Sequence, residues 1–296
     1  MEIITRESPN WKPVNLSTAQ AQYPQSENPD LPRNCFVGLF VGARNSGKTF
    51  SCVGLIKQME HSKIKKNNEP VKIRTILISP TAHVNEVFQK LTSLAPEDIH
   101  LEYSDELIKN IIDDIKATKA EAEDYKEKVR IYNKMLKMRK IDDMTMDELW
   151  ELDKMGYMPP VEPEYTTAPI TNLILDDLIG STAFRNGRSP LTNLILRNRH
   201  LGGGCNIFIC TQAMRQVPKA IRNNANVFSI YKYANAKMVL DDIYDEISNL
   251  LTEAQFQKLY EYATTGEGYD NFLFIDFTKK KPDIFRKGFK QFIQLK

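Results

Sequence analysis

The segment GARNSGKT at residues 42–49 limits the possible folds of this chain more than any other. It matches the pattern G-x-x-x-x-G-K-[ST] in full, and an apolar run, CFVGLFV, precedes it at residues 35–41. Residues 48–60 then have the apolar spacing of a helix. Glycines between a buried strand and a helix let backbone N–H groups turn inward around phosphate oxygens, and the helix N-terminus attracts negative charge. The sequence therefore predicts a phosphate-binding loop formed by Gly42, Ala43, Arg44, Asn45, Ser46, Gly47, Lys48 and Thr49.

The last two residues of the loop indicate which phosphate ligand it binds. Lys48 can reach the β- and γ-phosphates of a nucleotide, and the hydroxyl of Thr49 can coordinate Mg²⁺. The alternative, a glycine turn with an exposed lysine, fits the strand–loop–helix context less well. Guanine recognition normally needs an Asn-Lys-x-Asp loop after a late strand, and the sequence has none. We therefore expect ATP and Mg²⁺ as the ligands.

Two adjacent carboxylates, Asp176 and Asp177, follow the apolar run NLIL at residues 172–175. Ligands of open α/β sheets bind at the carboxyl ends of the strands, so both acids are expected beside the phosphate loop. Successive side chains of a strand point in opposite directions. Asp176 is therefore predicted to hold Mg²⁺, and Asp177 is predicted to polarise the water that attacks the γ-phosphate.

A third apolar run, NIFIC at residues 206–210, ends in Thr211 and Gln212. A neutral amide at this place can hydrogen-bond both a γ-phosphate oxygen and the attacking water. We therefore expect Gln212 to sense the state of the nucleotide. Glutamine at the end of a strand is common, so this prediction depends on the order in which the loop, the acids and the amide follow one another.

Basic residues gather between and after these last two runs. An arginine supplied across a subunit interface can stabilise the charge of a phosphoryl-transfer transition state. Arg199 and Arg222 are the preferred candidates for such an arginine finger, and Arg44 could act within its own chain. For each of the others, an ordinary surface position and a contact with a DNA backbone both stay open. These others are Arg185, Arg188, Arg197, His200, Arg215 and Lys219.

Most of the chain alternates buried strands with helices, which predicts an α/β fold with a mostly parallel central sheet flanked by helices. This domain is expected over residues 34–104 and 156–296. Its strands are expected at residues 35–41, 71–78, 172–176, 206–210, 227–231 and 271–277. Its helices are expected at residues 48–60, 84–94, 190–199, 217–224, 237–247 and 253–262, with a capping box at residues 252–255.

Two segments depart from this pattern. Residues 1–33 hold five of the fifteen prolines, which predicts an extended N-terminal arm. Residues 105–155 are rich in charge, with a narrow apolar stripe and a capping box at residues 145–148, and predict an inserted helical hairpin. The hairpin is either a solvated arm or a contact for DNA or a neighbouring subunit. That contact would use the basic residues Lys126, Lys128, Arg130, Lys134, Lys137, Arg139 and Lys140.

Composition narrows the class of protein further. The 296-residue chain has a net charge of +2, so any DNA contact must come from local basic patches. No run approaches the ~18 apolar residues of a membrane span, and the N-terminus lacks the apolar region of a signal peptide. The four cysteines form no CxxC pair, which disfavours a zinc site or a disulfide framework. We expect a protein of a reducing compartment with no membrane span.

Four segments together resemble a known family. GARNSGKT, NLILDD, RNRHLGGGCNIFICTQ and VPKAIRNNAN are similar to the DNA-packaging ATPases of large eukaryotic DNA viruses, the poxvirus-type enzymes of the FtsK–HerA branch of P-loop ATPases. The resemblance covers about residues 34–235. It implies a RecA-like sheet in which the strand before Gln212 lies between the phosphate-loop strand and the Asp-Asp strand. It transfers roles onto Lys48, Thr49, Asp176, Asp177 and Gln212, whereas the arginine finger and the insertion at 105–155 do not map onto the family pattern.

The resemblance also implies a function. It predicts an ATP-hydrolysing, homo-oligomeric ring that translocates double-stranded DNA into a viral capsid, with capsid or capsid-vertex proteins as further partners. Such a motor would act in the host cytoplasm or a viral factory, or in association with the virion. Three alternatives stay open. A nucleotide or small-molecule kinase would need an arginine-rich lid and an acceptor pocket, a non-catalytic nucleotide-gated scaffold would bind without turnover, and a helicase would displace strands of forked DNA.

Overall fold

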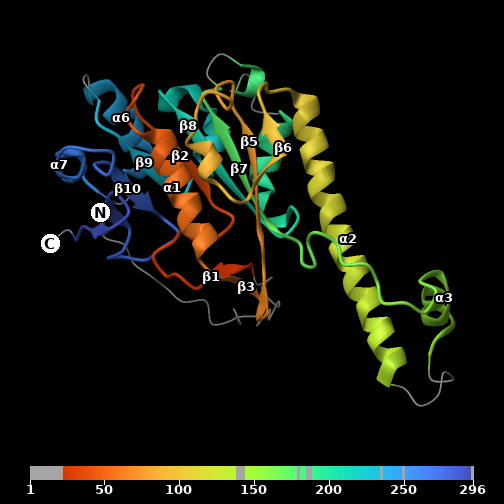
Figure 1. Cartoon of the computed structure of the whole chain (residues 1–296). Helices are drawn as coiled ribbons and strands as arrows, with labels where there is room; N and C mark the ends of the chain where they lie inside the picture. Colours follow the sequence, from red (N-terminus) through yellow and green to blue (C-terminus); the bar gives the residue numbers. More distant parts are fainter. Residues whose placement is uncertain are drawn as a thin grey trace, which may run out of the picture.

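A mixed sheet forms the centre of the computed structural model, which describes residues 23–137, 144–178, 181–184, 189–233, 236–248 and 251–294. The strand order of this sheet is β12-β11-β10-β9-β2-β8-β7-β5-β6 (Figure 1). The strands are β2 (Val37–Val41), β5 (Ile73–Ile78), β6 (Leu94–His100), β7 (Ile170–Asp176), β8 (Cys205–Thr211), β9 (Val227–Ile230), β10 (Leu273–Asp276), β11 (Phe285–Lys287) and β12 (Gln291–Phe292). A smaller sheet pairs β1 (Gln25–Ser26), β3 (Ile64–Lys66) and β4 (Glu69–Pro70).

Six neighbouring strands, in the spatial order β9-β2-β8-β7-β5-β6, run parallel to one another. The strands β10, β11 and β12 add an antiparallel edge beside β9. Strand β8 pairs with β2 on one side and with β7 on the other. The sheet is therefore mostly parallel, as the sequence predicts, and the implied position of the Gln212 strand between the other two is confirmed. The carboxyl ends of β2, β8 and β7 lie side by side, which places the residues that follow them at one edge.

Helices cover both faces of the sheet (Figure 1). They are α1 (Lys48–His61), α2 (Asp105–Lys137), α3 (Met146–Lys154), α4 (Pro190–Leu196), α5 (Lys219–Arg222), α6 (Ala236–Ile247) and α7 (Glu253–Thr264). Short 3₁₀ turns lie at Phe88–Lys90, Thr182–Phe184, Asn198–His200 and Met214–Gln216. Both predicted capping boxes are present, at the starts of α3 and α7.

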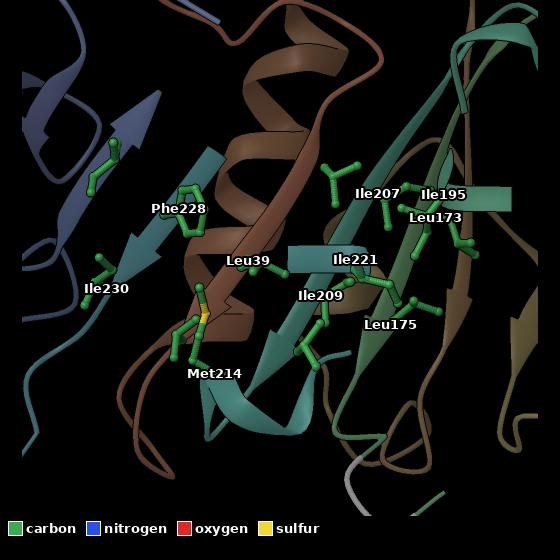
Figure 2. Packing of buried hydrophobic residues seen from close by; sticks show 14 of the residues in the cluster. Leu39, Leu173, Leu175, Ile195, Ile207, Ile209, Met214, Ile221, Phe228 and Ile230 are labelled. Atoms are coloured by element: carbon green, nitrogen blue, oxygen red, sulfur yellow. The ribbon is translucent and has the colours of Figure 1, made fainter. Parts of the chain in front are cut away.

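Alternation along the central strands divides the core between the two faces. On β2, Leu39 packs with Leu173, Ile207 and Phe228 on one face (Figure 2), where residues of α2, α4 and α6 also lie. Phe40 packs on the other face with the buried side of α1. Every residue of β2, β7 and β8 is buried. Strands covered on both faces need the continuous apolar runs that identify them in the sequence.

Residues 84–94 do not form the predicted helix. The chain there makes turns and one 3₁₀ turn, and Phe88 is the buried side chain of that turn. Strand β6 follows, parallel to β5 at the end of the sheet, and the sequence prediction missed it. The helix predicted at 217–224 is present but shorter than expected: α5 is a single turn over Lys219–Arg222. The other predicted helices are present with boundaries that differ by a few residues.

The charged segment folds as one long helix and one short one. The first half of α2 packs on the sheet domain, where Ile108, Ile111 and Ile115 join the main core. Beyond that point α2 extends past the sheet and carries α3 beside it (Figure 1). A small separate cluster with Ile131 and Leu152 joins the two helices.

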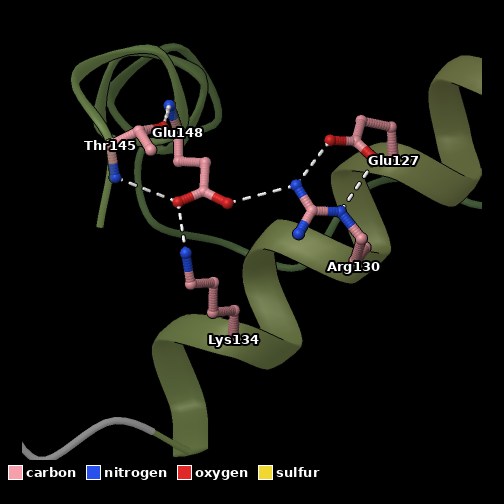
Figure 3. Close-up of polar contacts among 5 residues, drawn as sticks. All are labelled: Glu127, Arg130, Lys134, Thr145 and Glu148. Carbon is pink, nitrogen blue, oxygen red and sulfur yellow. Dashed lines mark hydrogen bonds and ion pairs between the residues drawn. The ribbon is translucent and has the colours of Figure 1, made fainter. Parts of the chain in front are cut away.

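Polar contacts also hold α3 against α2 (Figure 3). Glu148 accepts hydrogen bonds from Lys134 Nζ at 2.6 Å, from Arg130 Nη2 at 3.1 Å and from the backbone N–H of Thr145 at 3.0 Å. Three of the basic residues predicted to contact DNA or a subunit, Lys128, Arg130 and Lys134, are thus paired within the arm. A fourth, Lys126, pairs with Glu69 of β4. Residues 138–143, which include Arg139 and Lys140, lie outside the described residues.

Most of the predicted N-terminal arm, residues 1–22, also lies outside the described residues. The part that follows contacts the domain: β1 pairs with β3, and the side chain of Leu31 is buried. Among the helices of the described residues, none has the length and apolar character needed to cross a membrane.

Candidate active site

The phosphate loop connects β2 to α1. The backbone N–H of Gly42 donates to the carbonyl of Thr211 at 3.2 Å, which ties the loop to the end of β8. Asn45 and Gly47 have left-handed φ angles of 59° and 94°. A Cβ on Gly42 would lie 2.5 Å from Ser46 Oγ, so no larger residue fits there. The loop therefore needs glycine at its first position, and a loop of this kind can turn backbone N–H groups toward a phosphate.

Two observations show that this loop fits a phosphate group. The Ser46 hydroxyl is buried and has no hydrogen-bond partner among the described residues, so it can donate to a ligand oxygen. Lys48 Nζ donates to the carbonyls of Gly42 at 2.8 Å and Ala43 at 2.7 Å, which places the ammonium over the loop. Burial lowers the pKa of Lys48, and the carboxylates of Asp176 and Asp177 oppose that shift. A cation with this poor hydration favours a negatively charged ligand.

Asp176 is the last residue of β7, and its side chain is buried. Thr49 Oγ1 donates to Asp176 Oδ1 at 3.2 Å, and Ser79 Oγ, from the end of β5, reaches Asp176 Oδ2 at 3.5 Å. Burial raises the pKa of Asp176, while the hydrogen bond from Thr49 lowers it. Ser79 was missed in the sequence, although its position after a buried strand was a usable signal.

The oxygens of Thr49 and Asp176 fit a magnesium ion, because Mg²⁺ prefers hard oxygen ligands and usually keeps water and phosphate oxygens as well. The described residues contain no cluster of three or more histidine, cysteine or acidic side chains that could hold a metal by themselves. These two side chains therefore suit an ion that arrives with a nucleotide.

Asp177 and Gln212 lie on the outer side of the same edge, and both side chains are exposed. Gln212 Nε2 donates to Asp177 Oδ1 at 3.4 Å. Asp177 has a left-handed φ of 52°, which is uncommon for a residue other than glycine and turns the chain directly after β7. Tyr233 Oη donates to the carbonyl of Gln212 at 2.8 Å and fixes the start of the loop after β8. The loop, the two acids and the amide thus meet at one edge of the sheet.

The two preferred arginines lie at the other edge. Arg199 follows Asn198, whose amide donates to the carbonyls of Cys35 and Cys205 at the amino ends of β2 and β8. Arg222 donates to Glu246 Oε1 at 2.8 Å and to the carbonyl of Val217 at 2.8 Å. At ~3.3 Å per residue, the five residues of β2 separate this edge from the phosphate loop by about 16 Å. Neither arginine can reach the phosphates bound by its own chain.

Two of the remaining basic residues lie at the phosphate-loop edge. Arg44 is exposed within the loop itself. Arg215, three residues after Gln212, lies at the phosphate-loop edge and pairs with Asp242 Oδ1 at 2.5 Å. Arg185 and Arg188 lie outside the described residues.

The fold and this site have the arrangement that the phosphate-loop motif requires. The loop follows the central parallel strand β2, the acidic end of β7 lies two strands away, and the polar end of β8 lies between them. No protein-family model and no curated protein matches the chain.

Several solved structures resemble it. The genome packaging NTPase B204 from Sulfolobus turreted icosahedral virus 2, in complex with AMP, is 14% identical with a TM-score of 0.41, and the match covers 82% of this chain and 92% of that chain. ATPases 2 and 3 of EssC from Geobacillus thermodenitrificans are 13% identical with a TM-score of 0.44, over 81% of this chain and 37% of that chain. The cytoplasmic domain of the Thermomonospora curvata type VII secretion ATPase EccC is 11% identical with a TM-score of 0.42, over 88% of this chain and 23% of that chain.

Proposed function

We propose that the protein hydrolyses ATP and uses the energy to translocate double-stranded DNA into a viral capsid, as part of a homo-oligomeric ring. One observation carries the hydrolytic part: Thr49 contacts Asp176 at 3.2 Å, and Gln212 contacts Asp177 at 3.4 Å, at one edge of the sheet. The translocation part rests on the resemblance of the four sequence segments to packaging ATPases of the poxvirus type.

Binding would begin with the loop. Phosphate oxygens of ATP would accept from the backbone N–H groups of residues 43–49 and from Lys48 Nζ, which would leave its present carbonyl partners. Thr49 and Asp176 would hold Mg²⁺ as it enters with the nucleotide. The ion would neutralise charge on the β- and γ-phosphates. The positive charge nearby favours the carboxylate form of Asp176, against the effect of its burial.

Hydrolysis would use the exposed pair. The carboxylate of Asp177 would accept a proton from the attacking water, and the Gln212 amide would orient that water and contact a γ-phosphate oxygen. The amide would have to leave Asp177 Oδ1 to do so, because its Nε2 donates there now. Exchange of this hydrogen bond links the presence of the γ-phosphate to the loop after β8, whose start Tyr233 holds.

An arginine from a neighbouring subunit would complete the site. Arg199 suits this role better than Arg222, because its side chain is exposed, whereas Arg222 is held by Glu246 and a backbone carbonyl. We propose Arg199 as the finger acting in trans, which makes the site incomplete in a monomer. Capsid or capsid-vertex proteins would anchor the ring, in the host cytoplasm, a viral factory or the virion.

The decisive experiment measures phosphate release from ATP with and without duplex DNA, on a preparation whose oligomer is sized by light scattering. Stimulation by duplex DNA in an oligomer supports the motor. Turnover that ignores DNA would favour a kinase, and strand displacement on forked DNA would favour a helicase. Nucleotide binding without any turnover would leave a nucleotide-gated scaffold. A Lys48→Ala preparation controls for contaminating ATPases.

A further inference from the structure

Two exposed aromatic side chains lie beside the phosphate loop. Phe50, in the first turn of α1, is 46% exposed, and Tyr269, in the loop before β10, is 58% exposed. Their ring centroids are 5.4 Å apart and their planes are inclined by 36°. The apolar side chains further along α1, such as Val53 and Ile56, are buried in the core. Phe50 therefore contributes little to the packing of the helix and presents its ring to the solvent at the site.

The loop that carries Tyr269 has a defined shape. Gly266 and Gly268 have left-handed φ angles of 129° and 92°. The side-chain amide of Asn271 donates to the carbonyls of Glu267 at 2.6 Å and Gly268 at 3.2 Å, which closes the turn. A Cβ on Gly266 would lie 2.6 Å from Asn271 Oδ1, so this closure needs glycine. The turn therefore holds the tyrosine at a fixed place.

That place is directly over the phosphate loop. A Cβ on Gly47 would lie 2.7 Å from Tyr269 Cδ1, so the ring covers the residue that caps the N-terminus of α1. On the buried side of the loop, a Cβ on Gly42 would lie 2.7 Å from the Cβ of Tyr231, which stacks on Phe272 with centroids 5.0 Å apart. The phosphate loop thus lies between a buried tyrosine and an exposed one.

The order of the strands gives the direction of a bound nucleotide. Asp177 and Gln212, which would act at the γ-phosphate end of the nucleotide, follow β7 and β8 on one side of β2. Tyr231 directly follows β9 and Tyr269 lies in the loop before β10, and both strands are on the other side of β2. A triphosphate that crosses the loop with its γ end toward the acids has its nucleoside end toward Phe50 and Tyr269.

We propose that Phe50 and Tyr269 form the stacking surface for the purine base of the bound nucleoside triphosphate. This inference rests on the proposed nucleotide-binding function and adds the part of the site that holds the base. Flat aromatic rings stack on the face of a base, and such stacking is tolerant of base identity because every base has a π-face. The pair would therefore strengthen binding of ATP and GTP alike and leave selection between them to other groups.

A binding experiment separates the base from the phosphates. Dissociation constants for Mg·ATP, Mg·GTP and inorganic tripolyphosphate, which has no base, are measured by calorimetry for the wild type, Tyr269→Ala and Tyr269→Phe. The matched control is Tyr262→Ala, which removes another half-exposed tyrosine from the adjoining helix α7. Tyr269→Ala should raise the Kd for ATP and GTP about tenfold and leave tripolyphosphate within about twofold, because stacking contributes to the nucleoside alone. Tyr269→Phe and Tyr262→Ala should bind all three ligands as the wild type does.

Two results would overturn the inference. Unchanged affinity of Tyr269→Ala for ATP would show that the ring does not contact the base. An equal loss of ATP and tripolyphosphate would show that Tyr269 supports the phosphate loop instead. A wild-type protein that binds neither ATP nor tripolyphosphate would reject the proposed function itself, which is a different outcome from either of these.

Discussion

Thr49 Oγ1 donates a hydrogen bond to Asp176 Oδ1 at 3.2 Å, and these residues are 127 positions apart in the chain. The bond joins the first turn of α1 to the end of β7 across the intervening strand β8. It brings together the two side chains that suit Mg²⁺, and it places the metal position between the phosphate loop and the acidic strand end.

Asp176→Asn tests this relationship in two ways. Burial raises the pKa of Asp176, so keeping its carboxylate charged costs the folded state stability relative to the unfolded chain. A neutral amide of the same shape should therefore raise the melting temperature of the nucleotide-free protein. The same change removes a charged magnesium ligand and should lower ATP hydrolysis by about 10²–10³-fold. Differential scanning calorimetry and a phosphate-release assay measure the two effects. The exposed Asp113→Asn on α2 is the control and should change neither; a less stable Asp176→Asn protein with full activity would refute the assignment.

Lys48→Ala should remove ATP binding or reduce hydrolysis by at least about 100-fold, because no other described cation lies over the two carbonyls at the start of the loop. Lys57→Ala is a suitable control on the same helix, where Lys57 pairs with Glu60 at 3.0 Å. Nucleotide fluorescence titration and phosphate release give the measurements. Full turnover by Lys48→Ala in a clean preparation would show that the site is elsewhere.

Asp177→Asn and Gln212→Ala should separate binding from chemistry. Both side chains are exposed, and their hydrogen bond joins them to each other, so ATP affinity should stay within about threefold of the wild type. Loss of the proton acceptor Asp177, or of the Gln212 amide that orients the water, should lower hydrolysis by about 10²–10⁴-fold. Single-turnover kinetics distinguish the chemical step from binding. A variant that binds ATP poorly and hydrolyses the bound fraction at the normal rate would contradict these roles. Unchanged turnover in Asp177→Asn would instead favour a scaffold.

Much of this site could be predicted from the sequence, because its parts follow strands that are buried on both faces. The apolar runs before Gly42, Asp176 and Gln212 are continuous, and the residue after a buried parallel strand necessarily lies at the carboxyl edge. The position of the finger candidates could have been inferred in the same way. Arg199 precedes β8 closely and so must lie near its amino end.

Strand β6 could not be identified from apolar periodicity. Its sequence LAPEDIH contains proline and two acids, which a central strand would not tolerate but an edge strand can. One of these acids, Asp98, is buried because it forms two hydrogen bonds with Arg74 of β5, at 2.6 and 2.9 Å. Arg74 also reaches Asp114 of α2 at 2.5 Å. A long-range ion pair therefore stands where an apolar contact would make the strand recognisable, and only the folded arrangement reveals this pair.

The arginine finger is tested by mixing subunits. Arg199→Ala should bind ATP normally and lose turnover by about 10³–10⁵-fold, because the arginine would act on the transition state at a neighbour's site. Mixed with Lys48→Ala subunits, it should regain part of the activity, since an intact phosphate loop of one subunit then meets an intact arginine of the other. Arg197→Ala, an exposed arginine two residues away, is the control. Absence of recovery in mixed oligomers would exclude a finger acting in trans from Arg199.

Acid should release α3 from α2 before the sheet domain unfolds. Hydrogen bonds from Lys134 and from the Thr145 backbone hold the pKa of Glu148 at about 2, below its ordinary value of 4.5. A group whose pKa is depressed in the folded state stabilises that state fully at any pH above its pKa in the unfolded chain. This contribution is lost as the pH falls from about 4.5 toward 2.

Trp150 lies on α3, so its fluorescence in a Trp11→Phe background reports the docking of α3 on α2. Glu148→Gln should already show the released signal at neutral pH, because an amide cannot balance Lys134 and Arg130. Glu151→Gln, which removes an exposed pair with Lys154 on the same helix, should follow the wild-type curve; a wild-type signal that is flat from pH 5 to pH 2 would contradict the role of Glu148.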